Sequence, residues 1–86
     1  MGLINLSKSQ KVPVSEKALI QRINRKLKSD HEVVKKTRHG RAWRDLGDFY
    51  RLDWYRNTII DHHIDLEDLG RELEVLEAYE VLQPAE

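Results

Sequence analysis

The sequence predicts one small α+β domain, in which a helix is followed by a three-stranded antiparallel meander and a second helix, with both helices on one face of the sheet. Three observations support this class. The length of 86 residues matches a single domain. Apolar residues recur at helical spacing in residues 16–28 and again after residue 65. Between these segments, residues 48–64 alternate apolar and polar side chains, as strands do.

Residues 1–14 are expected to form a flexible tail, because polar residues and Pro13 dominate their second half. The first helix is expected over residues 16–28. Ser15 is a favourable N-cap, and Glu16 places a negative charge where the helix dipole favours one. The apolar face of this helix consists of Leu19, Ile20, Ile23 and Leu27.

Residues 31–38 are compatible with either a helix or a strand. Ser29 and Glu32 have the spacing of a capping box, which would start a helix. Three β-branched residues in the segment favour a strand. We favour the strand, because the hairpin that follows is only marginally stable with two strands and needs a third.

A loop over residues 39–47, marked by Gly40 and Gly47, is expected to lead into the hairpin. The first strand of the hairpin places three apolar residues on one face, and the second strand places two apolar residues and a histidine on one face. These residues are Tyr50, Leu52 and Trp54 on the first strand, and Ile60, His62 and Ile64 on the second. We expect this face to be buried.

The register of the hairpin follows from its faces. A three-residue loop over residues 55–57 pairs Leu52 with Ile60 and makes one face mostly apolar. A two-residue loop would instead place Asp61 opposite Leu52. The predicted pairs are Leu52–Ile60, Tyr50–His62 and Asp48–Ile64 on the apolar face, and Arg51–Asp61 and Phe49–His63 on the other face. Asn57 suits the left-handed position that closes such a loop.

The second helix is expected over residues 66–74 or somewhat beyond. Asp65 is its N-cap, and Gly70 weakens it by up to about 1 kcal/mol relative to Ala. Its apolar face consists of Leu66, Leu69, Leu73 and Leu76. Residues 83–86 are expected to fray, so the predicted domain spans residues 15–82.

The composition excludes several classes of protein. The absence of cysteine excludes a disulfide framework, a thiolate zinc site and a cysteine nucleophile. No apolar run approaches the roughly 20 residues that a membrane span needs. The four glycines are scattered, so there is no phosphate-binding glycine loop. We therefore expect a cytoplasmic protein without membrane association or a small-molecule cofactor.

The formal net charge is zero, but the charges are unevenly distributed. Residues 1–44 contain twelve Lys and Arg against three Asp and Glu, and residues 45–86 reverse this ratio. Such asymmetry is typical of an interaction surface. The alternative, which the sequence leaves open, is that the two halves pack together and neutralise each other.

The main functional signal is a basic-aromatic segment over residues 35–44. Cations neutralise phosphates, and an aromatic ring gives nucleic-acid bases a surface to stack on. The candidate nucleic-acid-binding residues are Lys35, Lys36, Arg38, Arg41, Trp43 and Arg44, extended by Arg22 and Arg25 on the first helix. The competing interpretation is a solvated loop whose Trp43 packs onto the core.

Asp61, His63 and Asp65 would share a face if the second hairpin strand extended that far, and imidazole and carboxylate groups suit zinc or manganese. Structural roles nevertheless account for each residue. Asp61 would face Arg51, His63 would stack on Phe49, and Asp65 would cap a helix. Because a metal site needs three or four converging ligands, we predict no metal site. No serine lies in a nucleophile context, so we also predict no catalytic residue.

Some segments resemble known proteins. Residues 61–63 (DHH) spell the motif of the DHH phosphoesterases, but the other acidic motifs of those enzymes are missing. Residues 46–52 (LGDFYRL) resemble the Gly-Asp-Tyr-Arg strand of small basic ribonuclease toxins. The chain as a whole resembles a family of small proteobacterial proteins with no known activity, through residues 22–27 (RINRKL), 46–50 (LGDFY) and 63–67 (HIDLE). That resemblance spans about residues 16–77 and implies a bacterial accessory protein.

Together, these observations favour a small non-enzymatic binding module that contacts nucleic acid through residues 35–44 and the basic side of the first helix. The alternative is a protein-interaction adaptor, whose acidic C-terminal helix docks on a partner or on a second copy. A toxin-like ribonuclease is the weaker alternative.

Overall fold

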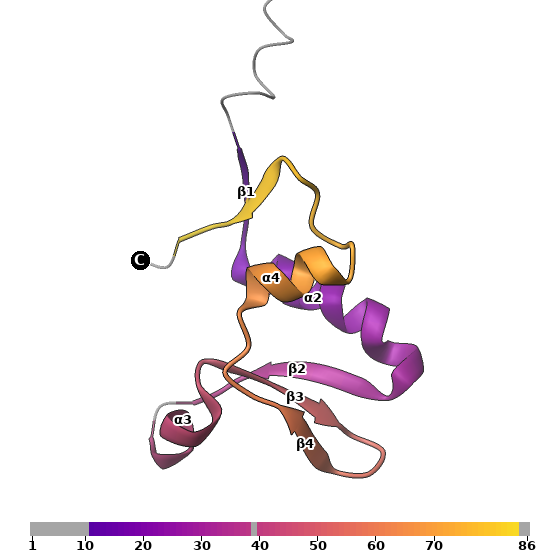
Figure 1. Cartoon of the computed structure of the whole chain (residues 1–86), viewed down its shortest axis with the longest axis vertical. Coiled ribbons are helices and arrows are strands. Elements are labelled where there is room, and N and C mark those ends of the chain that lie inside the picture. Colours follow the sequence, from indigo (N-terminus) through magenta and orange to yellow (C-terminus); the bar gives the residue numbers. More distant parts are fainter. Residues whose placement is uncertain (1–10, 39, 85–86) are drawn as a thin grey trace, which may run out of the picture.

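The computed structural model describes residues 11–38 and 40–84, and the side chains of residues 41 and 42 are outside this description. The fold is α+β and contains a three-stranded antiparallel sheet. In chain order the elements are β1 (Val12–Val14), α2 (Glu16–Leu27), the 3₁₀ turn η1 (Lys28–Asp30), β2 (Glu32–Lys36), α3 (Arg41–Leu46), β3 (Phe49–Asp53), β4 (Thr58–Asp61), α4 (Leu66–Glu72) and β5 (Glu80–Leu82) (Figure 1).

The predicted order of helix, three strands and helix is therefore incomplete, because β1, α3 and β5 were not expected. The first helix is confirmed as α2. The hydroxyl of Ser15 accepts a hydrogen bond from the backbone N–H of Ala18 (3.1 Å), as an N-cap does. Leu19, Ile23 and Leu27 are its buried residues. In the part of the chain that the structure describes, no helix has the length and apolar character needed to cross a bilayer.

The prediction of a strand in residues 31–38 is also confirmed, and β2 lies at one edge of the sheet in the order β2-β3-β4. Helix α2 packs beside this edge (Figure 1). The side chain of Asn24 pairs with the backbone of Val34: it accepts from the Val34 N–H (2.7 Å) and donates to the Val34 carbonyl (3.2 Å). The helix thus satisfies polar groups that an edge strand leaves free.

The hairpin register differs from the prediction. Arg51 pairs with Asp61 as expected, but Leu52 pairs with Ile59, and a bulge absorbs Ile60. The connection is a four-residue turn, because the Asp53 carboxylate accepts hydrogen bonds from the N–H groups of the second and third residues after it (both 3.0 Å). The left-handed conformation expected at Asn57 is present, with φ of 57°.

Strand β4 ends at Asp61, so the expected pairs farther along the ladder do not form. The backbone N–H of Ile64 donates to the carbonyl of Phe49 instead (3.2 Å), and the chain then turns into α4. His62 is exposed and does not pair with Tyr50.

The buried face of the sheet is the opposite of the predicted one. Val34 and Phe49 belong to the core, and Arg51, on the same face, forms an ion pair with Glu32 (3.4 Å). Tyr50 and Leu52 of the predicted core face lie on the side away from the core, whereas Ile64 of that face packs against the core. The alternation of residues in the sequence defines two faces of the sheet but does not show which face the helices cover. Arg51 can lie at the margin of the covered face because its charge is paired with Glu32.

The predicted loop over residues 39–47 contains the short helix α3, and its glycines bound that helix as N-cap and C-cap. The N–H of Gly47 donates to the carbonyl of Trp43 (2.8 Å) and closes the last turn. The N–H of Thr37 donates to the carbonyl of Asp48 (2.8 Å), which brings the two ends of the connection together.

Residues 12–14 of the predicted tail form strand β1, while residues 1–10 lie outside the described part of the chain. Strand β1 pairs in parallel with β5, in the register Val12–Glu80, Pro13–Val81 and Val14–Leu82 (Figure 1). The backbone N–H of Gln83, in the segment predicted to fray, donates to the carbonyl of Val14 (2.8 Å), and residues 85 and 86 are outside the description.

Helices α2 and α4 lie side by side over the core. Gly70 permits this contact, because a Cβ there would lie 3.0 Å from Cδ1 of Leu19 and 3.3 Å from Cβ of Leu76. The core residues are Val14, Leu19, Ile23, Leu27, Val34, Phe49, Leu66, Leu69 and Leu76.

Candidate nucleic-acid interface

The cations of the basic-aromatic segment point in different directions. Lys35 lies on the outer face of the sheet, on the side away from the core. Lys36 lies on the core side, where its ammonium group forms an ion pair with Glu16 of α2 (2.9 Å). Arg38 is exposed, and the side chain of Arg41 lies outside the description. Among the described residues of the segment, Lys35 and Lys36 therefore lie on opposite faces of the sheet.

Trp43 does not pack onto the core, as the competing interpretation of the sequence required. The residue is 46% exposed. Its indole Nε1–H donates to Oδ1 of Asp48 (2.7 Å), which holds the ring at the surface. Helix α3 positions this contact, because Gly47 ends the helix directly before Asp48. The result is a partly exposed indole in a fixed orientation.

Arg44 lies beside Trp43, and both residues line two shallow hollows. One hollow, of about 430 Å³, also includes Gly40. The other, of about 300 Å³, also includes Asp48 and His63. We call Arg38, Trp43 and Arg44 the Trp43 surface, since these are the exposed candidate residues at and just before α3.

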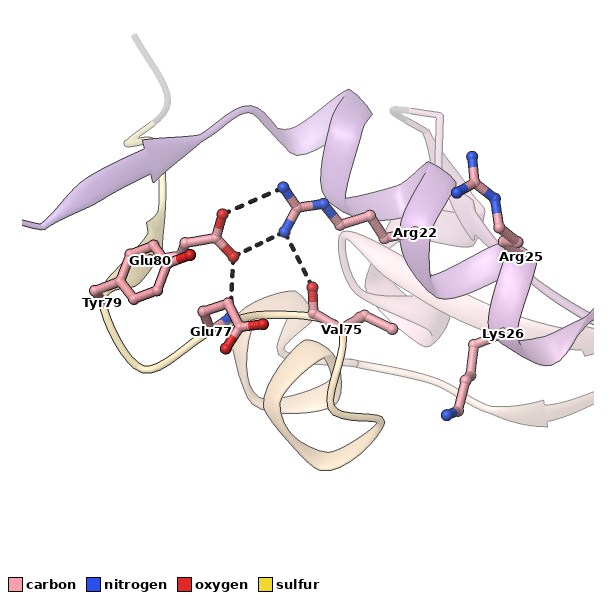
Figure 2. Close-up of a pocket in the computed structure, with 7 residues that line it drawn as sticks. All are labelled: Arg22, Arg25, Lys26, Val75, Glu77, Tyr79 and Glu80. Atoms are coloured by element: carbon pink, nitrogen blue, oxygen red, sulfur yellow. Dashed lines mark hydrogen bonds and ion pairs between the residues drawn. The ribbon is translucent and has the colours of Figure 1, made fainter.

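Arg22 is committed to a different contact. Its guanidinium forms two hydrogen bonds with the Glu80 carboxylate (2.8 and 3.2 Å) and donates to the carbonyl of Val75 (3.0 Å) (Figure 2). Hydrogen bonding to Arg22 lowers the pKa of Glu80, and the same bond raises the pKa of Arg22. Arg22 therefore cross-links α2 to the C-terminal segment.

Arg25 lines a hollow of about 600 Å³ beside that cross-link, together with Lys26 and Tyr79 (Figure 2). This hollow shares no residue with those around Trp43. Because α2 ends near the start of β2 and α3 follows the other end of β2, the structure separates Arg25 from the Trp43 surface (Figure 1). Arg22 and Arg25, which the sequence predicts as an extension of the nucleic-acid surface, therefore do not lie in one patch with α3.

The uneven charge of the chain is only partly neutralised by ion pairs. In the described residues, the pair Arg22–Glu80 joins a cation of the basic half to an acid of the acidic half, whereas Arg51–Glu32 pairs the minority charges of the two halves. The others, Lys36–Glu16, Arg56–Asp53 and Arg71–Glu67, lie within one half. Charge in excess of these pairs is left for interaction with solvent or with a partner, so the adaptor hypothesis stays a prediction.

The residues considered for a metal site have separate roles. Asp65 accepts a hydrogen bond from the N–H of Asp68 (3.1 Å) as the N-cap of α4, and Asp61 accepts from the N–H of His62 (2.9 Å). The Nδ1 atoms of His62 and His63 share a hydrogen bond (2.7 Å). Within residues 11–38 and 40–84, no group of three or more His, Cys, Asp or Glu is placed to hold a metal.

The sequence interpretation missed an aromatic cluster at the other end of the sheet. Trp54 and Tyr55, in the hairpin turn, are 50% and 75% exposed. The ring of His31 lies 5.1 Å from that of Trp54, edge to face, and 5.4 Å from that of Tyr55. Two adjacent aromatic residues in a turn were the available signal, but Trp54 was assigned to the buried face.

Comparisons with family models, with curated proteins and with solved structures find no match to this chain. The resemblance to small proteobacterial proteins therefore stays a prediction, and function is argued from the surface described above.

Proposed function

We propose that this chain is a small non-enzymatic binding module that contacts nucleic acid through the Trp43 surface. The observation that carries the proposal is the exposed indole of Trp43, which Asp48 fixes in place next to the exposed Arg44. An aromatic ring at the surface exposes apolar area to water, which is unfavourable. A hydrogen bond that holds the ring there keeps it available to a ligand.

The chemistry of this surface suits a phosphate polymer. Arg38 and Arg44 supply charge for phosphates, and Trp43 supplies a face on which a base or sugar can pack. The binding should be electrostatic in large part, so affinity should fall as salt rises. Lys36 and Arg22, which have carboxylate partners within the fold, should contribute less.

The test is a titration of tryptophan fluorescence with single-stranded DNA, duplex DNA and RNA at about 50 and 200 mM salt. Phe replaces Trp54, so that emission reports Trp43 alone. We expect quenching that weakens with salt. In the double variant R38A/R44A, the slope of log affinity against log salt should become shallower by about 1.4 to 1.8, as expected for two lost phosphate contacts.

The matched control is K11A/K26A, which removes the same charge at positions away from α3. If that control weakens binding as much as R38A/R44A does, the assignment to the Trp43 surface is wrong. If none of the three polymers changes the emission or binds in an independent filter assay, the proposed function is wrong. Far-UV circular dichroism shows whether each variant is folded.

A further inference from the structure

The three-stranded sheet has an outer face that no part of the described core covers. Val33 and Lys35 of β2 lie on it beside Leu52 and Tyr50 of β3, and Ile59 of β4 continues it. None of these residues belongs to the core or packs against it. Ile59 is 45% exposed. The sheet thus presents half-buried and exposed apolar side chains on a surface with a lysine among them.

A groove of about 320 Å³ lies at one end of this face. Its apolar walls are Val33, Leu52 and Trp54, and its polar lining consists of Lys28, Lys35, Asn24 and Glu32. We call these seven residues the Trp54 groove. It shares no residue with the hollows around Trp43, and it lies at the end of β2 opposite α3.

The indole of Trp54 is supported from behind. The Trp54 backbone N–H donates to the carbonyl of His31 (2.9 Å), and the His31 ring meets the indole edge to face. His31 itself has a left-handed backbone, with φ of 63°, which ends the 3₁₀ turn and directs the chain into β2. The ring therefore has a fixed base and an exposed side, as a stacking platform requires.

The charges next to the groove favour an anionic partner. Lys28 and Lys35 have exposed side chains. Two carboxylates in this region have partners: Glu32, which itself lines the groove, forms its ion pair with Arg51, and Asp53 accepts two backbone hydrogen bonds in the hairpin turn. An apolar recess with an indole, two lysines and one carboxylate that is already paired with Arg51 matches a base with its flanking phosphates better than an acidic or neutral peptide.

We infer that the Trp54 groove binds single-stranded nucleic acid, with one base stacked on Trp54 and the adjoining phosphates near Lys28 and Lys35. The inference rests on the proposed function and specifies its substrate class. A base inside a duplex is stacked on both sides and cannot enter the groove, whereas an unpaired base can. The open face and the Trp43 surface are then two contact points for the same type of strand.

The test uses single-tryptophan variants of the full chain, which is possible because the sequence contains two tryptophans. The W43F variant reports the groove, and the W54F variant reports the Trp43 surface. Each is titrated with an oligothymidylate of about 12 residues and with a duplex of the same length, since binding sites of this kind cover about 4–16 nucleotides. We expect the single strand, and not the duplex, to quench Trp54.

Affinity measurements on further variants separate stacking from charge. W54A should bind the single strand about tenfold more weakly, while W54F, which keeps an aromatic face, should stay within about threefold of the original chain. K28A/K35A should make the slope of log affinity against log salt shallower by about 1.4. The control K11A/K26A, with equal charge loss outside the groove, should leave this slope closer to that of the original chain.

The outcomes distinguish this inference from the proposed function. Quenching of Trp43 without quenching of Trp54, or equal quenching of Trp54 by duplex and single strand, would overturn the inference and leave the proposed function standing. If neither tryptophan fluorescence nor the filter assay detects binding, both this inference and the proposed function are wrong. If W54A binds the single strand with the same affinity as the original chain, the assignment of the groove is also wrong.

Discussion

Gly47 connects α3 to β3 in a backbone conformation that most residues adopt only at a cost. Its φ is 74°, and a Cβ at this position would lie 2.7 Å from Cδ2 and 2.8 Å from Cα of His63. The second contact is with backbone, which cannot rotate away. The same glycine precedes Asp48, so the geometry that holds Trp43 at the surface depends on it.

We therefore expect G47A to lower the free energy of unfolding by about 1–3 kcal/mol, through left-handed strain and the clash with His63. Urea denaturation measures the loss. Gly40 is a suitable control, because its φ of 136° is also unfavourable for Ala but no atom lies within 4 Å of the added Cβ. A G47A variant no less stable than G40A would contradict the role given to the clash.

The contact between Arg22 and Glu80 makes stability depend on pH. Because Arg22 lowers the pKa of Glu80 in the folded state, the carboxylate binds its proton more readily when the chain is unfolded. This stabilisation is fully present above the unfolded pKa, which is about 4.3 for Glu, and is lost as pH falls through the lower folded pKa.

The E80Q variant should accordingly have a lower Tm at pH 7 and a smaller decrease of Tm on acidification than the original chain. Thermal unfolding is followed by circular dichroism from pH 7 to below the unfolded pKa of Glu, and it measures both quantities. E72Q, at an exposed position of α4, is the control and should retain the original pH dependence. An unchanged acid limb in E80Q would assign the effect to other carboxylates.

At the scale of an element, α2 shows how far local pattern determines structure. Leu19, Ile23 and Leu27 are buried as their spacing predicts. Asn24 lies among polar residues in the sequence, and nothing in its spacing indicates that its amide pairs with the Val34 backbone. The helix is thus predictable from periodicity, whereas its attachment to the sheet edge is not.

We expect N24A to cost about 1–3 kcal/mol, because it leaves the Val34 N–H and carbonyl without these partners. Q21A, an exposed change one turn earlier in α2, should stay within about 0.5 kcal/mol of the original chain. Chemical denaturation compares the two variants, and equal stability of both would show that water replaces the Asn24 amide at no cost.

The hairpin shows the limit of pattern in another way. Alternation in residues 48–64 correctly predicts two strands and the Arg51–Asp61 pair. The turn length depends on which backbone groups the Asp53 side chain binds, and the bulge at Ile60 follows from that choice. The side chain of Asp53 therefore explains why the observed partner of Leu52 differs from the predicted one.

For the candidate site, the sequence predicted the exposed basic residues around Trp43 but not their division. Arg22 binds a carboxylate 58 positions later in the chain, a pairing that no local pattern indicates. The prediction places Trp54 on the buried face, and it also chooses the wrong face of the sheet as the buried one. Both errors have the same cause, because the alternation of residues does not distinguish the two faces of a sheet. Long-range contacts, and not residue types, decided both points.

At the scale of the whole molecule, the parallel pair β1 and β5 joins segments from the two ends of the described chain (Figure 1). Val14 of β1 is 6% exposed and belongs to the same core as α2, whereas Val12 of the same strand is 49% exposed. The two valines therefore test whether this segment is an integral part of the domain.

We expect V14A to lower the free energy of unfolding by about 1–3 kcal/mol and V12A by less than about 0.5 kcal/mol. The measurement is again urea denaturation, with the m-value checked for constancy. A negligible effect of V14A would indicate a tail, as the sequence alone suggested, and not a strand of the core.

The pairing of β1 with β5 also sets an order for folding. Contacts within the hairpin and between α2 and β2 close short stretches of chain, whereas the pairing of Val12 with Glu80 closes nearly the whole described chain, and we expect it to form late. During synthesis, β1 is made before its partner β5, so it stays unpaired until β5 is present. We therefore expect the sheet and α2 to fold early and the closing strand pair to complete the domain.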